Sequence, residues 1–566
     1  MTKLKMIDQL NKILTTSTNT YDEIYLYELI KSTLMESRED FFVGDLLAYA
    51  YKHYPDKTAL IYQDKKVTYT ELLFRAILLS KKYTEQGVTA RDHVLLYVEN
   101  SLEFYVAYYA AWMLGSVVVP LNIYLHAKEL AFIIQDAQPK IIFASQELKK
   151  NLDPTTPYVA SKGWQTRENS AQDYKLENTH IFTQQDVDWQ TPITKQTINE
   201  YITQLETNSQ ARLAYDELCL LLYTSGTTGK PKGVMLSSRN IITNAMQCMA
   251  RFIKLGLRSD ERFFCVLPLF HVFAQNTCIW LPILAGGSVI IVGKIDRRLI
   301  LEGLTNKPTL FLGFPALYGL LCLMKTAPLE NVKFFISGAD MLPDKIRLGF
   351  AMIYGRKICA GYGLTEASPV VAVNIYNNEK DTTVVGCPLA HIDCEIRDNN
   401  GQKVDVGTIG TLWLRGDNIM LGYYKTPEAT AQVLQDKWLN TGDLARINTN
   451  GLLDITGRSK DLIIHKGFNI YPQEIENILM SHPAVFKAAV VGKLEDGTGQ
   501  VPIAYVAVKD FTEEQKTSLE HSLKKLCNNN LAPYKIPRKF ICLTDLPMSA
   551  TGKIDKKQIA RLEQTD

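Results

Sequence analysis

Residues 224–233 combine glycines, hydroxyl side chains and lysines at the end of an apolar run that predicts a strand. Glycines let backbone N–H groups approach an anion, while hydroxyl and ammonium groups add donors and positive charge. The segment therefore predicts a loop that binds a polyphosphate. It is not a P-loop, because only two residues separate Gly226 from Gly229 and a proline follows Lys230 where serine or threonine is required. The residues expected to bind are Thr224, Ser225, Gly226, Thr227, Thr228, Gly229, Lys230 and Lys232.

Four further short motifs place charged residues beside glycine or threonine. They read Gly-Tyr-Gly-Leu-Thr-Glu at 361–366, Thr-Gly-Asp-Leu at 441–444, Gly-Arg-Ser-Lys-Asp at 457–461 and Pro-Met-Ser-Ala-Thr-Gly-Lys-Ile at 547–554. Beside a phosphate-binding loop, the Glu366 carboxylate suits Mg²⁺, which proteins usually hold through one or two carboxylates together with the substrate phosphates. Isolated residues such as Asp443 or Lys553 are more often ordinary surface residues, so their significance comes from the set.

Taken in order, these motifs resemble those of the adenylate-forming superfamily, which comprises acyl-CoA synthetases, luciferases and the adenylation domains of peptide synthetases. The resemblance runs from about Phe42 to Ile554 and covers most of the chain. It implies an enzyme in which a carboxylate attacks the α-phosphate of ATP and releases pyrophosphate. A thiol then attacks the resulting mixed anhydride, takes the acyl group, and AMP leaves. The implied substrates and cofactors are ATP, Mg²⁺, coenzyme A and a small-molecule carboxylic acid.

The resemblance also implies roles for individual residues. The catalytic roles belong to Lys553, Glu366 and His271; Glu366 is the metal ligand, and His271 lines the path between the acid and CoA sites. An ammonium at Lys553 can reach a carboxylate and the α-phosphate together and offset their charge. Lys460 occupies the hinge position. The remaining implied contacts with the nucleotide or CoA are Gly338, Ala339, Tyr362, Gly363, Thr365, Asp443, Arg458 and Gly467.

The acid is expected to be apolar. Relatives that activate amino acids place an aspartate directly after the position of His271, but here that residue is Val272, which leaves an α-amino group without a counter-ion. The run from Tyr362 to Asn374 is most similar to medium- and long-chain fatty acyl-CoA ligases, although the chain length does not follow from it. The expected pocket lining is apolar and comprises Val272, Phe273, Phe314 and Pro315.

Other functions stay open within the same superfamily. A fatty acyl-AMP ligase would load the phosphopantetheine of a carrier protein, and relatives of that type carry an insertion before the hinge; the interval 373–410 shows no obvious insertion. An aryl-acid CoA ligase is a further alternative. A luciferase-like oxygenase would share the fold and the adenylation step, so the sequence does not dismiss it, although it is less favoured. A binding protein without activity is less favoured because every reactive position of the family is present.

The elements that must position these residues read as α/β. Between 218 and 360, short apolar strands alternate with helical segments, which predicts layered, mostly parallel sheets with ligands at the carboxyl ends of the strands. We expect strands near 220–223, 263–266, 289–292, 310–312, 334–336 and 357–359, and helices at 240–253 and 315–324. A last α/β segment after Gly457 is expected to contain a helix at 472–480 and strands at 488–491 and 503–508.

Three parts are expected along the chain. Residues 1–40 form a helical extension whose apolar face consists of Ile24, Leu26, Leu29, Ile30 and Leu34. Residues 41–458 form a large adenylation domain that binds ATP and the acid. Residues 459–566 form a small, mobile C-terminal domain with the hinge at its start and the catalytic lysine loop near its end. The polar stretch 146–210 is expected to be a solvated insertion.

Composition excludes several classes of protein. In 566 residues, 46% are hydrophobic and 22% are charged, which excludes disorder for most of the chain. The net charge of +2 offers no overall attraction to nucleic acid. Ten cysteines without a CxxC pair indicate a cytoplasmic protein without a disulfide framework. The apolar run 104–121 reads as a buried helix and strand and not as a membrane span; peripheral membrane contact and a homodimer stay open.

Overall fold

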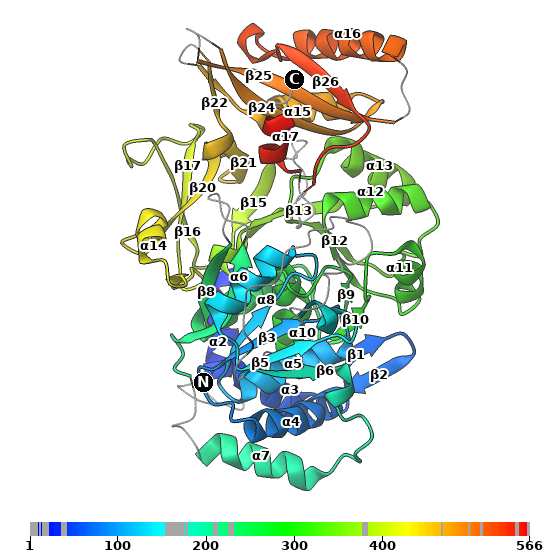
Figure 1. The fold of residues 1–566 in the computed structure, drawn as a ribbon, viewed down its shortest axis with the longest axis vertical. Helices are drawn as coiled ribbons and strands as arrows, with labels where there is room; N and C mark the ends of the chain where they lie inside the picture. The colour runs from blue at the N-terminus through cyan, green and yellow to red at the C-terminus, as the bar shows by residue number, and fades with distance from the viewer. Residues whose placement is uncertain are drawn as a thin grey trace.

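The computed structural model describes residues 10, 13, 22–35, 42–152, 176, 179–207, 213–224, 231–375, 383–465, 468–495, 499–509, 513–548 and 554–562. Its strands form three sheets of 14, seven and five strands. The first two sheets build a large body, and the third forms a separate layer above it together with its own helices (Figure 1).

One half of the 14-stranded sheet is mostly parallel. Six neighbouring strands run the same way, with β2 (Lys65–Thr68) antiparallel at the edge: β1 (Thr58–Tyr62), β10 (Ser288–Ile291), β9 (Arg262–Cys265), β11 (Leu310–Gly313), β12 (Phe334–Ser337) and β13 (Ile358–Gly363). The five strands expected between 263 and 359 are confirmed. The helix expected at 315–324 is α12 (Pro315–Met324), which starts with proline at its first position, where the missing N–H costs nothing.

The other half of this sheet is antiparallel, which the sequence prediction did not include. It consists of β14 (Val370–Val373), β15 (Val384–Pro388), β21 (Leu453–Arg458), β20 (Trp438–Ile447), β17 (Gly410–Arg415), β16 (Asp393–Arg397) and the short β19 (Leu434–Gln435). The change of direction lies between β13 and β14, which only residues 364–369 connect. A parallel crossover needs a dozen or more residues, so this short connection requires an antiparallel pair.

The seven-stranded sheet corrects a second expectation. The strand expected at 220–223 is β7 (Leu218–Thr224), but it lies in a different sheet from the other five strands expected between 263 and 359. The strand order of its own sheet is β18 (Gly422–Tyr423), β8 (Lys232–Ser237), β7, β4 (Val117–Pro120), β3 (His93–Tyr97), β5 (Ile141–Ala144) and β6 (His180–Thr183). A buried apolar run shows that a strand is present but does not select its partner, which is why the sequence did not separate the two sheets.

Two long helices lie in the core of the body. In α5 (Leu102–Met113) every residue except Glu103 is buried, and in α8 (Ser238–Lys254) only Arg239 and Lys254 are not. The apolar run 104–121 is therefore α5 followed by β4, as expected. Among the described residues, no helix has both the length and the apolar character that a membrane span needs. Within the polar stretch 146–210, β6 completes the edge of the second sheet and α7 (Lys195–Thr207) lies on the surface.

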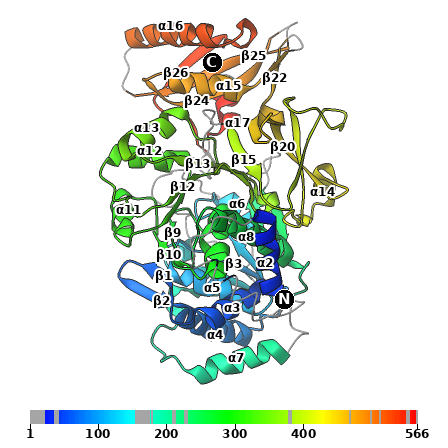
Figure 2. The ribbon, with the colours of Figure 1, turned by 180° about the vertical axis from the view of Figure 1, so that it is seen from behind.

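The N-terminal extension contains α2 (Glu23–Met35), which packs beside α8 (Figure 2). Its apolar residues Leu26, Leu29, Ile30 and Leu34 are buried as expected, but Ile24 is 52% exposed. Placing Ile24 on the same face was wrong, because two residues correspond to about 200° around a helix. The Glu23 carboxylate pairs with buried Arg251 and accepts a hydrogen bond from the backbone of Ala390, which attaches this helix to the body.

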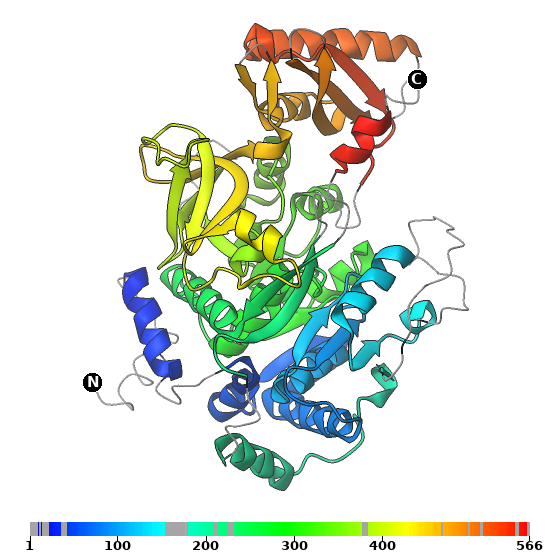
Figure 3. The same cartoon turned by 60° about the vertical axis from the view of Figure 1, so that its left-hand side comes forward.

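The five-stranded sheet is built only from residues after 462. It contains β23 (Phe468–Ile470), β22 (Ile463–His465), β25 (Gly499–Val508), β24 (Val485–Glu495) and β26 (Lys539–Leu543), with helices α15 (Pro472–Ser481), α16 (Glu513–Asn530) and α17 (Lys556–Leu562). Its hydrophobic residues form clusters of their own, and it stands apart from the body when the molecule is turned (Figure 3). The expected α/β segment is confirmed; the boundaries at 40 and 458 stay predictions.

Candidate active site

A cavity of about 870 Å³ collects the residues singled out in the sequence. It lies where β9, β11, β12 and β13 end, opposite the end of β7, as expected for ligands at the carboxyl ends of parallel strands. The predicted site residues that line it are Thr224, Lys232, His271, Gly338, Ala339, Tyr362, Gly363, Thr365, Glu366, Asp443, Arg458 and Lys460. The others lie outside the described residues: Ser225, Gly226, Thr227, Thr228, Gly229, Lys230, Gly467 and Lys553.

Asp443 is the most constrained carboxylate of the cavity. It is 5% exposed, accepts a hydrogen bond of 2.6 Å from the Tyr362 hydroxyl at Oδ2, and pairs at 3.1 Å with Arg458 Nε at Oδ1. Arg458 faces Asp443 because the two residues are register partners on β21 and β20. Burial, and then the neighbouring Asp443 charge, hold the pKa of Tyr362 well above its usual value, so the hydroxyl remains a donor.

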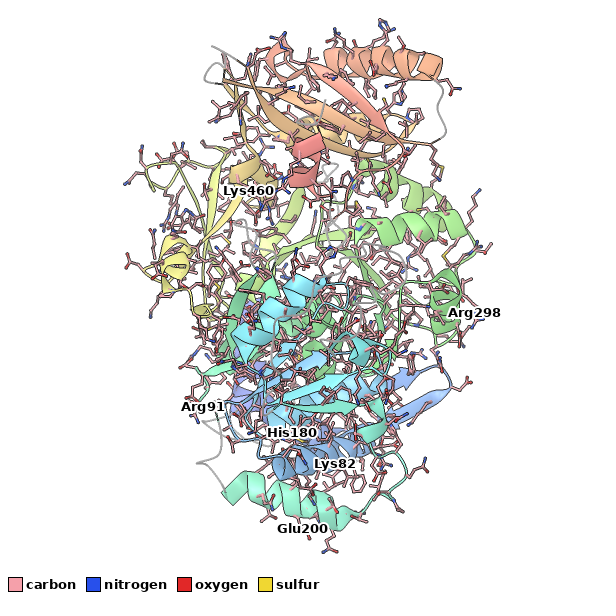
Figure 4. The ribbon with its side chains drawn as sticks, in the orientation of Figure 1. Lys82, Arg91, His180, Glu200, Arg298 and Lys460 are labelled. Atoms are coloured by element: carbon pink, nitrogen blue, oxygen red, sulfur yellow. The ribbon has the colours of Figure 1, made fainter. Side chains whose placement is uncertain are left out.

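Lys460 lies at the junction between the body and the third sheet (Figure 4). It belongs to a single turn of 3₁₀-helix, Ser459–Asp461, directly after β21. Burial, followed by the nearby Arg458 charge, lowers its pKa from the usual 10.5. At a given pH, a larger fraction of Lys460 is therefore in the neutral amine form than for an exposed lysine.

Two contacts from residues 420–423 hold Glu366, and a third from Asn418 holds the residue after it. Its Oε1 accepts a 2.9 Å hydrogen bond from the Tyr423 hydroxyl, and its backbone oxygen accepts one of 2.9 Å from Met420 N. Asn418 Nδ2 donates to the backbone oxygen of the next residue, Ala367. Burial and the Glu366 charge raise the pKa of Tyr423. No motif pointed to Tyr423, because only the tertiary fold brings β18 against the 365–367 turn.

Tyr423 also contacts the predicted phosphate loop. The Lys232 ammonium lies 4.9 Å from the centroid of the Tyr423 ring, within the range of a cation–π contact. Thr224 and Lys232 are register partners on β7 and β8, and both line the cavity. One tyrosine thus contacts both a carboxylate and an ammonium group.

The Glu366 carboxylate fits a metal ion that is also bound by a phosphate group of the ligand. Within the described ranges, no group of three or more His, Cys, Asp or Glu residues could enclose a metal ion alone. Glu366 faces the cavity with one oxygen engaged by Tyr423. Mg²⁺ is commonly held by one or two carboxylates plus substrate phosphates, so Glu366 fits this ion only together with a phosphate group.

Close packing at the cavity requires glycine at position 363 and favours it at position 338. A Cβ atom at Gly338 would lie 3.1 Å from the Phe273 ring, and one at Gly363 would collide with the carbonyl oxygen of Pro369. Ala339 follows in the left-handed region with φ of +69°. These positions let the backbone after β12 and within β13 approach the ligand space.

The opposite end of the cavity is apolar. His271 is the residue directly before α9 (Val272–Gln275), and the centroid of its ring lies 4.7 Å from that of Phe270. The four predicted lining residues, Val272, Phe273, Phe314 and Pro315, all contact the cavity, as expected. Sequence reasoning missed several further lining residues, which come from α8, the 276–280 π-helix and β14: Cys248, Phe252, Thr277, Val370 and Val373. They carry no motif, and only the packing of these elements places them here.

Comparison with known proteins agrees with this geometry. The model of the AMP-binding enzyme family matches residues 47–424, and that of the AMP-binding enzyme C-terminal domain matches residues 474–553. A long-chain-fatty-acid–CoA ligase of Bacillus subtilis (strain 168) is 30% identical over 522 residues, which cover 90% of this chain and 92% of the relative.

Solved structures show the same architecture. ATP-bound MatB from Rhodopseudomonas palustris is 27% identical with a TM-score of 0.77, covering 92% of this chain and 99% of its own. O-succinylbenzoate coenzyme A synthetase from Bacillus subtilis, in complex with ATP and magnesium ion, is 25% identical with a TM-score of 0.75, covering 91% and 99%. The expected fold class, a large N-terminal α/β domain with a small C-terminal one, is confirmed. The chain belongs to the AMP-binding enzymes, the adenylate-forming superfamily that its motifs resemble.

Proposed function

We propose that the protein is an AMP-forming ligase that activates a medium- or long-chain fatty acid with ATP and transfers the acyl group to coenzyme A. One observation carries the proposal: a single cavity joins a charged end, with Asp443, Arg458 and Glu366, to an apolar end on α8 and α9. This arrangement suits a reaction between a nucleotide and an apolar acid. The family and the relatives support an acid–CoA ligase that uses ATP, Mg²⁺ and CoA.

At the charged end, each residue has a binding role. The Asp443 carboxylate accepts hydrogen bonds from the ribose hydroxyls, and Arg458 donates to ribose or phosphate. Tyr362 packs against adenine, with Gly338, Ala339 and the 361–363 backbone beside it. Thr224, Thr365, Lys232 and the loop 225–230 hold the phosphates, and Glu366, oriented by Tyr423, takes the metal ion.

The reaction brings two anions together, so charge neutralisation and alignment supply most of the catalysis. When bound, Mg²⁺ offsets phosphate charge. Lys553 approaches the acid carboxylate and the α-phosphate from the small domain. Rotation at Lys460 then removes Lys553, and the segment with Gly467 approaches the CoA chain while His271 lines its path.

The decisive experiment measures AMP and pyrophosphate release with acids from acetate to oleate, with and without CoA. Saturable AMP release that needs both a fatty acid and CoA supports the proposal and gives the chain preference. Lys553→Ala should lose acid-dependent pyrophosphate release but still convert supplied acyl-AMP to acyl-CoA. Equal loss in both steps would contradict the role of Lys553, and no turnover with any acid would refute the ligase.

Aryl acids are the second candidate substrates. The solved o-succinylbenzoate coenzyme A synthetase covers most of this chain, and the aromatic side chains Phe273 and Phe314 line the acid end. Benzoate and o-succinylbenzoate therefore belong in the panel, and a preference for either would replace the fatty acid. Pyrophosphate exchange without an acyl-CoA product would point to a carrier protein as the acceptor.

A further inference from the structure

Helix α8 carries a row of buried polar side chains on one face. Asn240, Asn244, Gln247 and Arg251 follow one another at helical spacing, and none of them is more than 4% exposed. Their side chains donate hydrogen bonds to backbone carbonyl oxygens between residues 370 and 419. Because buried donors rarely go without an acceptor, the row fixes the position of α8 against β14, β15 and the segments that follow them.

Arg251 is the charged member of this row. Its Nη1 atom donates to the carbonyl oxygen of Val373 on β14 at 3.1 Å, and its Nη2 atom donates to that of Pro388 on β15 at 2.8 Å. A guanidinium that is removed from water needs a counter-charge, because an unpaired ion in the interior is costly. The counter-charge is the carboxylate of Glu23, in the first turn of α2.

The Glu23 side chain uses both of its oxygens. Oε2 accepts a hydrogen bond from Arg251 Nε, and Oε1 accepts one of 3.0 Å from the backbone N–H of Ala390. The carbonyl oxygen of Ala390 accepts in turn from Gln247 Nε2 at 2.7 Å. One carboxylate of the N-terminal helix therefore completes a buried network that joins α8 to residues 370–390.

The elements joined by this network also form a wall at the acid end of the cavity. Cys248 and Phe252 line the cavity from α8, and Val373, whose carbonyl oxygen binds Arg251, lines it from β14. Helix α2 packs beside α8, and none of its described residues lines the cavity (Figure 2). A shift of α8 away from β14 would therefore change the space for the acid, whereas the nucleotide end is built on β20 and β21.

We propose that Glu23 determines which lengths of acid the cavity accepts, because its pairing with Arg251 holds the wall between α8 and β14 in place. Glu23 is a positioning residue, since it acts through Arg251 and does not touch the acid. Without its carboxylate, the buried guanidinium regains a favourable environment only if water enters beside α8 and the helix shifts from β14. A wall that yields discriminates less between acids that differ by a few methylene groups. The use of fatty acids as probes rests on the proposed function.

Chain-length selectivity of the full chain tests this role. The value of kcat/KM is measured with ATP and CoA for fatty acids from hexanoate to stearate in steps of two carbons. Glu23→Gln keeps the shape of the side chain and removes its charge. It should lower the ratio of kcat/KM between the preferred acid and the acid one step longer about fivefold. The KM for ATP should stay at the wild-type value, because the nucleotide end does not depend on this wall.

Two matched variants serve as controls. Glu23→Asp keeps the charge and should retain most of the wild-type selectivity. Glu28→Gln makes the same substitution on the same helix, but the Glu28 side chain is 51% exposed and pairs with His391, so this variant should behave like the wild type.

Arg251→Met tests whether Glu23 acts through Arg251. It removes the buried charge itself, so it also carries the test if Glu23→Gln does not melt as a folded protein. Because the contacts with the carbonyl oxygens of Val373 and Pro388 are lost, it should relax the chain-length selectivity as well. Adding Glu23→Gln to this variant should cause no further change in the selectivity.

Hydrogen–deuterium exchange without substrates gives a readout that does not depend on turnover. Glu23→Gln should speed the exchange of backbone amides in 238–254 and 370–373 and leave 438–458 unchanged. If the wild type activates no fatty acid, the proposed function fails, while this measurement still decides whether Glu23 holds the wall.

Three results would overturn the inference. One is wild-type selectivity in a Glu23→Gln variant that thermal melting shows to be folded. Another is an equal fall of kcat/KM for every acid together with a higher KM for ATP, because the pair would then stabilise the whole body and not the acid wall. The third is unchanged amide exchange of residues 238–254 in that variant.

Discussion

The two ends of the cavity are built in opposite ways. At the nucleotide end, Asp443 is held by Tyr362 and Arg458, and Glu366 is held by Tyr423. At the acid end, the walls are apolar side chains from several helices. Charged groups with fixed partners bind only ligands whose polar atoms lie in the matching geometry. An apolar wall binds any apolar group of suitable size and shape. We therefore expect the nucleotide end to discriminate by chemistry and the acid end by size and shape.

The largest effect should come from Asp443→Ala. It removes the proposed ribose acceptor and leaves the Tyr362 hydroxyl and Arg458 without their partner, so ATP affinity should fall about 100-fold, or about 2.7 kcal/mol. Calorimetric titration with ATP measures the change. Asp454→Ala is the matched control, because Asp454 is also buried and pairs with Arg446 on the same hairpin. Equal loss of ATP affinity in both variants would show that the hairpin fold matters and not the ribose contact.

Val272→Asp should separate the two ends. An uncompensated carboxylate in the apolar wall should raise the KM for a fatty acid about 30-fold and leave the KM for ATP unchanged. Steady-state kinetics with each substrate varied in turn checks this. Val272→Asn has nearly the same shape without the charge and should show a smaller rise. A parallel increase in both KM values would argue against independent ends.

Tyr423→Phe should have a smaller effect, confined to the metal. Losing the hydrogen bond to Glu366 frees that carboxylate to rotate, so the Mg²⁺ concentration for half-maximal activity should rise about tenfold. Binding of Mn²⁺ in the presence of ATP, followed by electron paramagnetic resonance, gives a readout independent of turnover. Tyr424→Phe is the control, because Tyr424 faces His93 instead. An unchanged Mg²⁺ requirement would show that Tyr423 does not position Glu366 for the metal ion.

The smallest effect concerns the protonation of Lys460. Arg458→Gln removes the second cause of its lowered pKa and keeps the first, burial, so the pKa should rise but stay below 10.5. The pH dependence of amine acylation, read by mass spectrometry, reports this pKa. Between the native pKa and 10.5, the unfolded chain binds more protons at this lysine than the folded chain does. The contribution of Lys460 to the free energy of unfolding therefore rises with pH in that window. A full return to 10.5 would mean that burial contributes nothing.

Prediction from sequence succeeded where local patterns decide the outcome. Proline at its start and an apolar run defined α12, and each predicted site residue that the structure describes lines the cavity. Prediction from sequence failed where the outcome depends on which distant strand or side chain an element packs against. The sheet that contains β7, the antiparallel half after β13 and the contact between Tyr423 and Glu366 all depend on residues distant in sequence. Their signals are absent from any local window.

The sequence by itself predicted which residues do chemistry, because glycines, hydroxyls, lysines and carboxylates at set spacings carry their chemistry with them. Only the tertiary structure decided what these residues do together. It paired Asp443 with Arg458 across two strands, turned Tyr423 toward Glu366, and joined the charged end to apolar walls from α8 and β14. The physical reason is that hydrogen bonds and burial act over a few ångströms in space, whereas motifs record only neighbours along the chain.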